Sequence, residues 1–256
     1  MLQGKTALVT GSTSGIGLGI ALALARQGAN IVLNGFGDTA GPTAQVAALG
    51  ARVAYHGADM SKPTEIEAMM QFAAAQFGQV DILVNNAGIQ HVASVEDFPV
   101  DKWDAIIAIN LTSAFHTTRL ALPAMKAANW GRVINIASAH GLVASAHKSA
   151  YVASKHGLVG FTKSLALETA RTGVTSNAIC PGWVLTPLVQ KQIDARAASA
   201  GISVAQAQEE LLAEKEPSLQ FTTPDELGAL AVFMCSPAGN NVRGVAWQMD
   251  GAWTAQ

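Results

Sequence analysis

Short apolar runs alternate along the chain with longer amphipathic stretches. Seven of these runs are predicted as strands, at residues 6–10, 30–34, 52–55, 82–85, 133–137, 176–180 and 246–249. Several are nearly continuous apolar segments, which is typical of parallel strands that are buried on both faces. The longer stretches between them are predicted as helices, and the first of these helices is expected at 18–27.

The repeated strand–helix–strand order predicts one open parallel sheet of seven strands with helices on both faces. This is the doubly wound α/β class, which right-handed crossovers produce. Ligands in this class bind beyond the carboxyl ends of the strands, where the strand order reverses, so candidate chemistry is expected just after strands.

One stretch, residues 187–218, interrupts this rhythm because it is longer than an ordinary connection. Its Ala, Gln and Glu residues favour helix, and we interpret it as a helical lid over the site, with a surface excursion without function as the alternative. The chain has no linker, repeat or low-complexity tract. It is therefore predicted to be a single catalytic domain over 1–256.

Composition and charge narrow the function classes. The chain is 50% hydrophobic and 13% charged, against about 25% charged in typical soluble proteins, which favours a large core and buried subunit contacts. The net charge of −2 gives no general attraction to nucleic acids or anionic lipids, and no apolar run approaches the roughly 20 residues that span a bilayer. No signal for secretion precedes the first predicted strand, so a cytoplasmic location is expected.

The two cysteines, Cys180 and Cys235, lack the spacing of metal ligands and are too few for a disulfide framework. We expect both to be small apolar core residues, and no metal site is predicted.

The first predicted strand leads into a glycine-rich turn, Thr10-Gly11-Ser12-Thr13-Ser14-Gly15-Ile16-Gly17, and then into a helix. Gly11 permits a tight turn, Gly15 allows backbone amides to approach a pyrophosphate, and Gly17 lets the helix pack close to the sheet. The spacing is GxxxGxG, and glycine-rich turns without ligands are common. The loop predicts a dinucleotide site only together with other motifs.

The end of the second strand distinguishes NAD from NADP. An acidic residue there binds the ribose hydroxyls of NAD, or an arginine accepts the 2′-phosphate of NADP. Residues 34–38 read Asn-Gly-Phe-Gly-Asp, with neither signal in its usual place. No Lys or Arg lies in 12–14 or 34–38, so NAD is predicted.

A second constellation follows the fifth strand, where Ser138 precedes a helix that carries Tyr151 and Lys155. Residues four apart share one helical face. An ammonium near a phenol favours the phenolate, so Lys155 is expected to lower the pKa of Tyr151, and the Ser138 hydroxyl can donate to a reacting oxygen. The alternative is an ordinary amphipathic helix with a half-buried Tyr and a Lys whose ammonium reaches solvent.

Taken in order, several motifs make the chain resemble the short-chain dehydrogenase/reductases over essentially its whole length. The matching motifs are Thr10 to Gly17, Asn85-Asn86-Ala87-Gly88, Asn110, Ser138, Tyr151 with Lys155, and Pro181-Gly182 followed by Thr186. The resemblance implies a Rossmann-type fold and a hydride-transfer enzyme.

The resemblance also implies residue roles. Tyr151 donates or accepts the proton, Lys155 lowers the pKa of Tyr151 and holds the nicotinamide ribose, Ser138 orients the substrate, and Asn110 positions a proton-relay water. It implies cofactor contacts at Gly11, Thr13, Gly15, Ile16, Gly17, Phe36, Asp59, Met60, Asn86, Ala87, Gly88, Tyr151, Lys155, Val184 and Thr186.

Four polar residues near these motifs suggest an anionic substrate: Gln90, His140, Lys148 and Gln192. Lys148 can supply charge for a carboxylate while the other three donate hydrogen bonds. Each taken singly is as readily an ordinary loop or lid residue.

Together with Ser138, Tyr151 and Trp183, those four positions resemble the branch of the family that oxidises (R)-3-hydroxybutyrate to acetoacetate in bacteria. In that branch Phe36 stands where NAD-using members usually carry an acidic residue. The resemblance implies closure of the lid with Gln192 on the carboxylate, and a homotetramer. The alternatives are a reductase of 3-oxoacyl thioesters, a sugar or polyol dehydrogenase, and a non-catalytic dinucleotide sensor.

Overall fold

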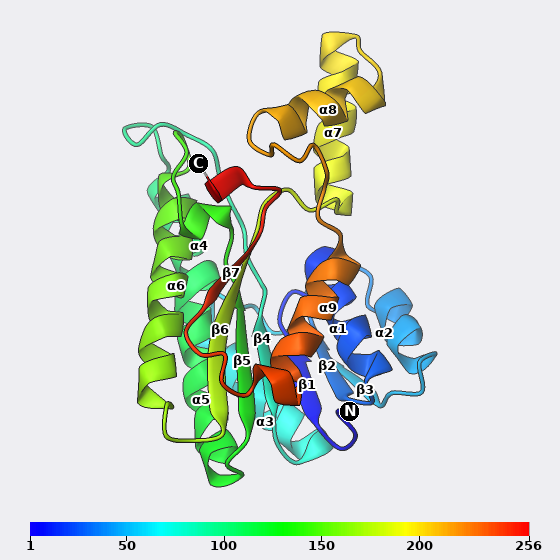
Figure 1. The fold of residues 1–256 in the computed structure, drawn as a ribbon, viewed down its shortest axis with the longest axis vertical. Coiled ribbons are helices and arrows are strands. Elements are labelled where there is room, and N and C mark those ends of the chain that lie inside the picture. The colour runs from blue at the N-terminus through cyan, green and yellow to red at the C-terminus, as the bar shows by residue number, and fades with distance from the viewer. Residues whose placement is uncertain (256) are drawn as a thin grey trace.

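The computed structural model of the chain describes residues 1–255. Its centre is one parallel sheet with the strand order β3-β2-β1-β4-β5-β6-β7 (Figure 1). The strands are β1 (Thr6–Val9), β2 (Asn30–Asn34), β3 (Val53–His56), β4 (Ile82–Asn85), β5 (Gly131–Ile136), β6 (Val174–Pro181) and β7 (Ala246–Met249). All seven predicted strands are confirmed, with ends that differ by at most two residues, and so is the doubly wound α/β class.

The strand order reverses beside β1. Val9 of β1 is in register with Leu33 of β2 on one side and with Val84 of β4 on the other. The chain builds outward from β1 to β3 and then returns to start β4 on the opposite side. The connections therefore separate at the carboxyl ends of β1 and β4, which leaves room for a ligand there.

The strands are buried on both faces because successive side chains point to opposite sides. In β1, Ala7 and Val9 join the core beneath one helical layer, while Leu8 joins the core beneath the other. One layer consists of α1 (Gly15–Arg26), α2 (Ala40–Ala47) and α9 (Pro224–Cys235) (Figure 1). The other contains α3 (Pro63–Phe77), α5 (Ser113–Ala127) and α6 (Ser149–Glu168), with α4 (Val100–Ile107) beside α6.

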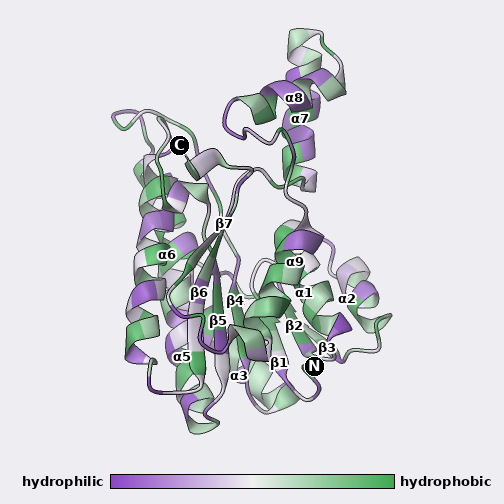
Figure 2. Ribbon diagram, viewed as in Figure 1, coloured by the Kyte–Doolittle hydropathy of each residue, from purple (hydrophilic) through white to green (hydrophobic). Residues whose placement is uncertain are grey.

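Apolar surface is concentrated where the layers meet. Helices α1 and α9, which pack against each other, are predominantly hydrophobic (Figure 2). Cys180 and Cys235 are buried free thiols within the core, as predicted. No helix within residues 1–255 combines the length and the hydropathy that a bilayer-crossing segment needs.

Helix α1 begins at Gly15, three residues earlier than predicted. Gly15 and Gly17 therefore belong to its first turn. The amides of that turn have no partners within the helix and lie next to the end of β1.

The segment predicted at 187–218 is helical and projects away from the sheet, beyond the carboxyl ends of the strands (Figure 1). It forms α7 (Pro187–Ala200) and α8 (Val204–Ala213), which share a small core of their own. A single β-bridge between Val184 and Thr222 joins the two ends of the excursion. Short helical turns complete the chain, one π-type at Ala108–Thr112 and three 3-10 turns at Ala139–Gly141, Pro237–Gly239 and Trp253–Ala255.

Candidate active site

A cleft of about 390 Å³ runs along the carboxyl ends of β1, β4, β5 and β6. Parallel strands end at the same edge of the sheet, so segments far apart in sequence meet there. Of the predicted site residues, the cleft is lined by Gly11, Gly15, Ile16, Asn86, Ala87, Gly88, Gln90, Ser138, Tyr151, Lys155, Trp183, Val184, Thr186 and Gln192.

The glycine loop forms one wall of this cleft. Gly11 and Gly15 have φ values of 61° and 55°, a region in which residues with a Cβ are strained. A Cβ on Gly11 would lie 2.9 Å from Ala87 Cα, and one on Gly15 would lie 3.3 Å from Thr186 Cγ2. Because α1 has neither a side-chain cap nor an acidic residue in its first turn, its amides are available to an anion such as pyrophosphate.

The loop after β4 braces the glycine loop. Asn86 Nδ2 donates to the carbonyl oxygens of Thr10 (2.8 Å) and Gly11 (2.9 Å). The backbone amides of Asn86 and Ala87 both donate to Thr10 Oγ1 at 3.0 Å. Two motifs about 75 residues apart in sequence therefore form one rigid unit.

The end of β2 holds no charged side chain toward the cleft. Asn34 turns inward, where its Oδ1 accepts from the Gly11 amide and its Nδ2 donates to the carbonyls of His56 and Ala58. The next aromatic residue, Phe36, is 67% exposed, and its carbonyl accepts from Thr13 Oγ1 at 2.8 Å. Asp38 is engaged in accepting the amides that start α2.

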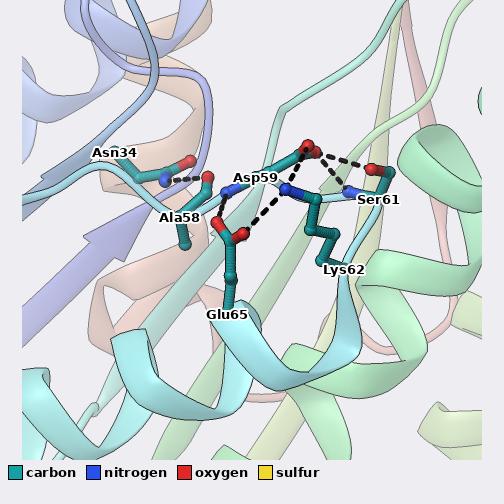
Figure 3. Close-up of polar contacts among 6 residues, drawn as sticks. All are labelled: Asn34, Ala58, Asp59, Ser61, Lys62 and Glu65. Carbon is teal, nitrogen blue, oxygen red and sulfur yellow. Dashed lines mark hydrogen bonds and ion pairs between the residues drawn. The ribbon is translucent and has the colours of Figure 1, made fainter.

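The neighbouring loop after β3 presents a fixed carboxylate, as Figure 3 shows. Asp59 accepts from the Ser61 amide (2.9 Å) and hydroxyl (2.7 Å), and these bonds hold its pKa below the ordinary value. The ammonium of Lys62 pairs with both Asp59 and Glu65. Met60 is buried behind this loop.

Helix α6 carries Tyr151 and Lys155 on one face, within its first two turns. The Lys155 side chain is buried, its Nζ donates to the Ile136 carbonyl at 2.7 Å, and burial lowers its pKa to about 8. The ammonium lies 5.6 Å from the centroid of the Tyr151 ring.

Burial dominates the pKa of the Tyr151 phenol. Burial raises it above its ordinary value, and the opposing influence is a hydrogen bond from Ser138, not the charge of Lys155. The lowering of this pKa by Lys155 stays a prediction, since its ammonium is itself desolvated and donates to the Ile136 carbonyl.

Asn110 lies in the π-helical turn between α4 and α5, a local widening that is often found at functional sites. Its Oδ1 accepts from the Ile89 amide, and its Nδ2 donates to the Ile89 carbonyl, both at 2.9 Å, and to Ser154 Oγ at 3.2 Å. A Cβ on Gly88 would lie 3.4 Å from Asn110 Oδ1 and 3.6 Å from Lys155 Nζ. The three residues therefore converge behind Tyr151.

A smaller cavity of about 80 Å³ adjoins Tyr151 and collects most of the predicted substrate residues. His140 is buried with its ring edge toward Tyr151, and its Nε2 lies 2.9 Å from Ser145 Oγ. Burial, with the nearby charge of Lys148, lowers the pKa of His140 to about 4, so the imidazole is neutral at pH 7. The cavity is lined by Gln90, Ser138, His140, Lys148, Tyr151, Gly182, Trp183 and Trp253.

Lys148 is half-buried, and its ammonium lies 5.8 Å from the centroid of the Trp183 ring. Burial and the positive charge of Lys215 lower its pKa. Lys148 is therefore a partly desolvated cation facing a polar cavity. Gln192, by contrast, lies on exposed α7 and reaches only the larger cleft.

Sequence reasoning missed Trp253. It follows β7 near the end of the chain, and its ring packs edge-on against His140 with 4.9 Å between centroids. Nothing local distinguishes it from any other aromatic residue after a strand. Its place in the cavity depends on the neighbouring positions of β6 and β7 in the sheet.

Comparison with known proteins agrees with this geometry. Residues 5–197 match the family described as short chain dehydrogenase. The chain is 72% identical to the D-beta-hydroxybutyrate dehydrogenase of Cupriavidus necator, with all of both chains covered, and 55% identical to that of Rhizobium meliloti, with 98% of this chain and 99% of the relative covered. Among solved structures, an actinorhodin polyketide ketoreductase variant with NADPH matches with a TM-score of 0.92 and 33% identity over the whole of both chains.

Proposed function

Since this chain belongs to the short-chain dehydrogenase family, we propose that it is an NAD-dependent dehydrogenase that interconverts (R)-3-hydroxybutyrate and acetoacetate. The main observation in favour of a hydroxy-acid substrate is the 80 Å³ cavity beside Tyr151, which Lys148 lines together with the uncharged side chains of Gln90 and His140. The two D-beta-hydroxybutyrate dehydrogenases that are 72% and 55% identical to the chain support the same assignment.

The cleft fits an extended dinucleotide. The amides at the start of α1 would receive the pyrophosphate, Asp59 and Met60 would flank the adenine beside exposed Phe36, and Thr186 would hold the carboxamide. The end of β2 offers no cation to a 2′-phosphate, and Lys62 is already paired with two carboxylates, which favours NAD. A bound NAD would supply the hydride acceptor.

The proton is handled by residues of α6 and β5. Tyr151 accepts the hydroxyl proton of the substrate during oxidation and returns it during reduction. Ser138 donates a hydrogen bond to the same oxygen, and Lys155 favours the phenolate during the transfer. Asn110 fixes the backbone of Ile89 and thereby a place for a relay water.

The carboxylate end is held separately. Lys148 pairs with the carboxylate, while Gln90 and neutral His140 donate hydrogen bonds, and Trp183 closes the apolar side around the methyl group. Gln192 joins when α7 and α8 fold over the cleft as a lid and exclude water. The chain then works as one catalytic domain.

The test is a substrate panel in which reduced nicotinamide is measured with (R)-3-hydroxybutyrate, its (S) enantiomer and butan-2-ol, each with NAD and with NADP. We expect kcat/KM to be highest for the (R) acid with NAD. A rate with the acid no better than with the neutral alcohol would refute the hydroxy-acid assignment. Faster reduction of 3-oxoacyl thioesters or sugars would favour the other family activities, and no turnover with any pair would favour a dinucleotide sensor.

We also infer a homotetramer that works in the cytoplasm. The low charge of 13% supports buried subunit contacts, and exposed apolar residues on α4 and α5, including Val100, Trp103 and Phe115, offer a surface for them. The mass in solution tests the subunit number.

A further inference from the structure

Glu216 is a fully buried acidic residue at the root of the excursion formed by α7 and α8. It follows α8 and stands where the chain returns to the sheet. Its carboxyl group lies between two glycines: a Cβ on Gly182 would overlap Oε1, and a Cβ on Gly251 would lie 3.0 Å from Oε2. The site is therefore shaped closely around this side chain.

The returning segment lies between the substrate cavity and the last strand. Thr222 donates its amide to the Trp183 carbonyl at 3.0 Å, and its own carbonyl accepts from Leu185 at 3.2 Å. On the other side, the Ser218 amide donates to the Gly251 carbonyl at 3.1 Å. Glu216 is thus fixed at the junction of the lid, the Trp183 loop and the segment that carries Trp253.

The two carboxyl oxygens of Glu216 differ in their partners. Oε1 accepts a hydrogen bond from the Trp183 amide, whereas Oε2 is buried and has no hydrogen-bond partner. The negative charge of buried Asp250 disfavours a second negative charge on the carboxyl group of Glu216. None of the salt bridges among residues 1–255 includes Glu216. The ammonium of Lys148 lies over the Trp183 ring and that of Lys215 over the Trp253 ring.

We propose that Glu216 is a positioning residue that works as a neutral carboxyl, fixing the Trp183 backbone and with it one wall of the substrate cavity, and that loss of its proton loosens this wall. The consequence for substrate binding rests on the proposed function of the cavity. The effect on the Trp183 loop does not depend on it.

The physical reason is the cost of a second buried negative charge. Burial raises the pKa of Glu216 from 4.5 to about 7; the hydrogen bond from the Trp183 amide opposes this rise, and the negative charge of Asp250 adds to it. Above that pH the carboxylate is driven toward water and away from Asp250. The Trp183 amide then loses its acceptor, and both ends of the lid lose a shared anchor.

The first experiment compares the pH dependence of KM in the wild type and in Glu216→Gln, which keeps the shape and the acceptor oxygen but cannot ionise. In the wild type, KM for 3-hydroxybutyrate should rise about three- to tenfold more than in the variant between about pH 6 and about pH 8.5, with kcat changing equally in both. Lys148 and His140 titrate alike in the two proteins, so the ratio isolates Glu216. Glu209→Gln, an exposed change on α8, is the matched control and should follow the wild type.

The second experiment needs no substrate. The pH-dependent part of the tryptophan fluorescence near pH 7 should disappear in Glu216→Gln and in Trp183→Phe but persist in Glu209→Gln. The Glu216 carboxyl ionises more easily in the unfolded chain, where its pKa is 4.5, than in the folded chain, where it is about 7. As pH rises from about 5 to about 8, ionisation therefore favours the unfolded state, and Tm of the wild type should fall relative to that of Glu216→Gln.

The outcomes separate the two proposals. If 3-hydroxybutyrate is not turned over but the fluorescence and Tm differences appear, the proposed substrate is wrong and the role of Glu216 stands. If KM, fluorescence and Tm follow the same pH course in the wild type and Glu216→Gln, the positioning role is refuted, whatever the substrate.

Discussion

Replacing Lys148 with Met tests the carboxylate site most directly. Met keeps most of the apolar stem of the side chain and removes the ammonium, which lies 5.8 Å from the centroid of the Trp183 ring. A hydrogen bond to a charged group contributes about 1.5–3 kcal/mol, and about 1.4 kcal/mol is a factor of ten. Because Lys148 is only half-buried, the lower part of that range applies, and KM for 3-hydroxybutyrate should rise about 10- to 50-fold with little change in kcat.

The pH dependence gives a second readout from the same residue. Burial and Lys215 lower the pKa of Lys148 below the ordinary 10.5, so the cation is lost earlier than in a solvated lysine as pH rises. KM of the wild type should therefore increase on the alkaline side, whereas KM of Lys148→Met should be high throughout and lack the increase that loss of the Lys148 charge causes.

Initial-rate assays with saturating NAD measure both effects, with butan-2-ol as a substrate that carries no carboxylate. Lys191→Met is the matched control, since it removes one charge from exposed α7 next to Gln192. A KM change below twofold in Lys148→Met, or an equal loss with butan-2-ol, would show that Lys148 does not bind the carboxylate.

Three further substitutions test the proton path, the glycine loop and the core. Tyr151→Phe should lower kcat by about 10²- to 10⁴-fold while NAD affinity, measured by calorimetry, stays unchanged; preserved turnover would remove Tyr151 from the mechanism. Gly17→Ala should weaken NAD binding at least tenfold in the same titration, because the added Cβ would overlap the Gly11 carbonyl and lie 2.9 Å from Ser12 Cα; normal affinity would show that the loop can adjust. Arg132→Met should cost about 3 kcal/mol of stability, read as a fall in Tm of roughly 6–12 °C, with kcat at low temperature unaffected; an unchanged Tm would contradict the stabilising role of this buried cation.

The last of these predictions follows from an unusual environment. Arg132 is fully buried at the start of β5, the end of the strand far from Ser138. Its guanidinium donates to three backbone carbonyls and to Asn240 Oδ1 instead of to a carboxylate. Met would leave these acceptors without a donor in a region that water does not reach.

Sequence patterns alone determined the strands, the sheet class and the order of the motifs. A strand whose residues are nearly all apolar is removed from water only when both of its faces are buried. In β1, Ala7 and Val9 are buried on one face and Leu8 on the other. The glycine loop was also predictable from the local sequence, because glycine readily adopts the positive φ that Gly11 and Gly15 show. The ends of the helices depend on more than the apolar pattern. Helix α1 starts at Gly15, three residues before its predicted position, because Gly15 and Gly17 form its first turn.

Tertiary structure decided what the charges do and which distant residues share a cavity. The sequence places Lys155 four residues after Tyr151, yet the pKa of Tyr151 is governed by burial, a quantity that depends on every segment packed around it. Trp253 reaches the cavity because β6 and β7 are neighbours in the sheet, and Glu216 reaches it through a hydrogen bond from the Trp183 amide, 33 residues away in sequence. No local spacing marks either residue. Helix, strand and turn preferences act over a few residues and can be read from the chain, whereas desolvation and cavity walls are sums over contacts between remote segments and exist only in the folded molecule.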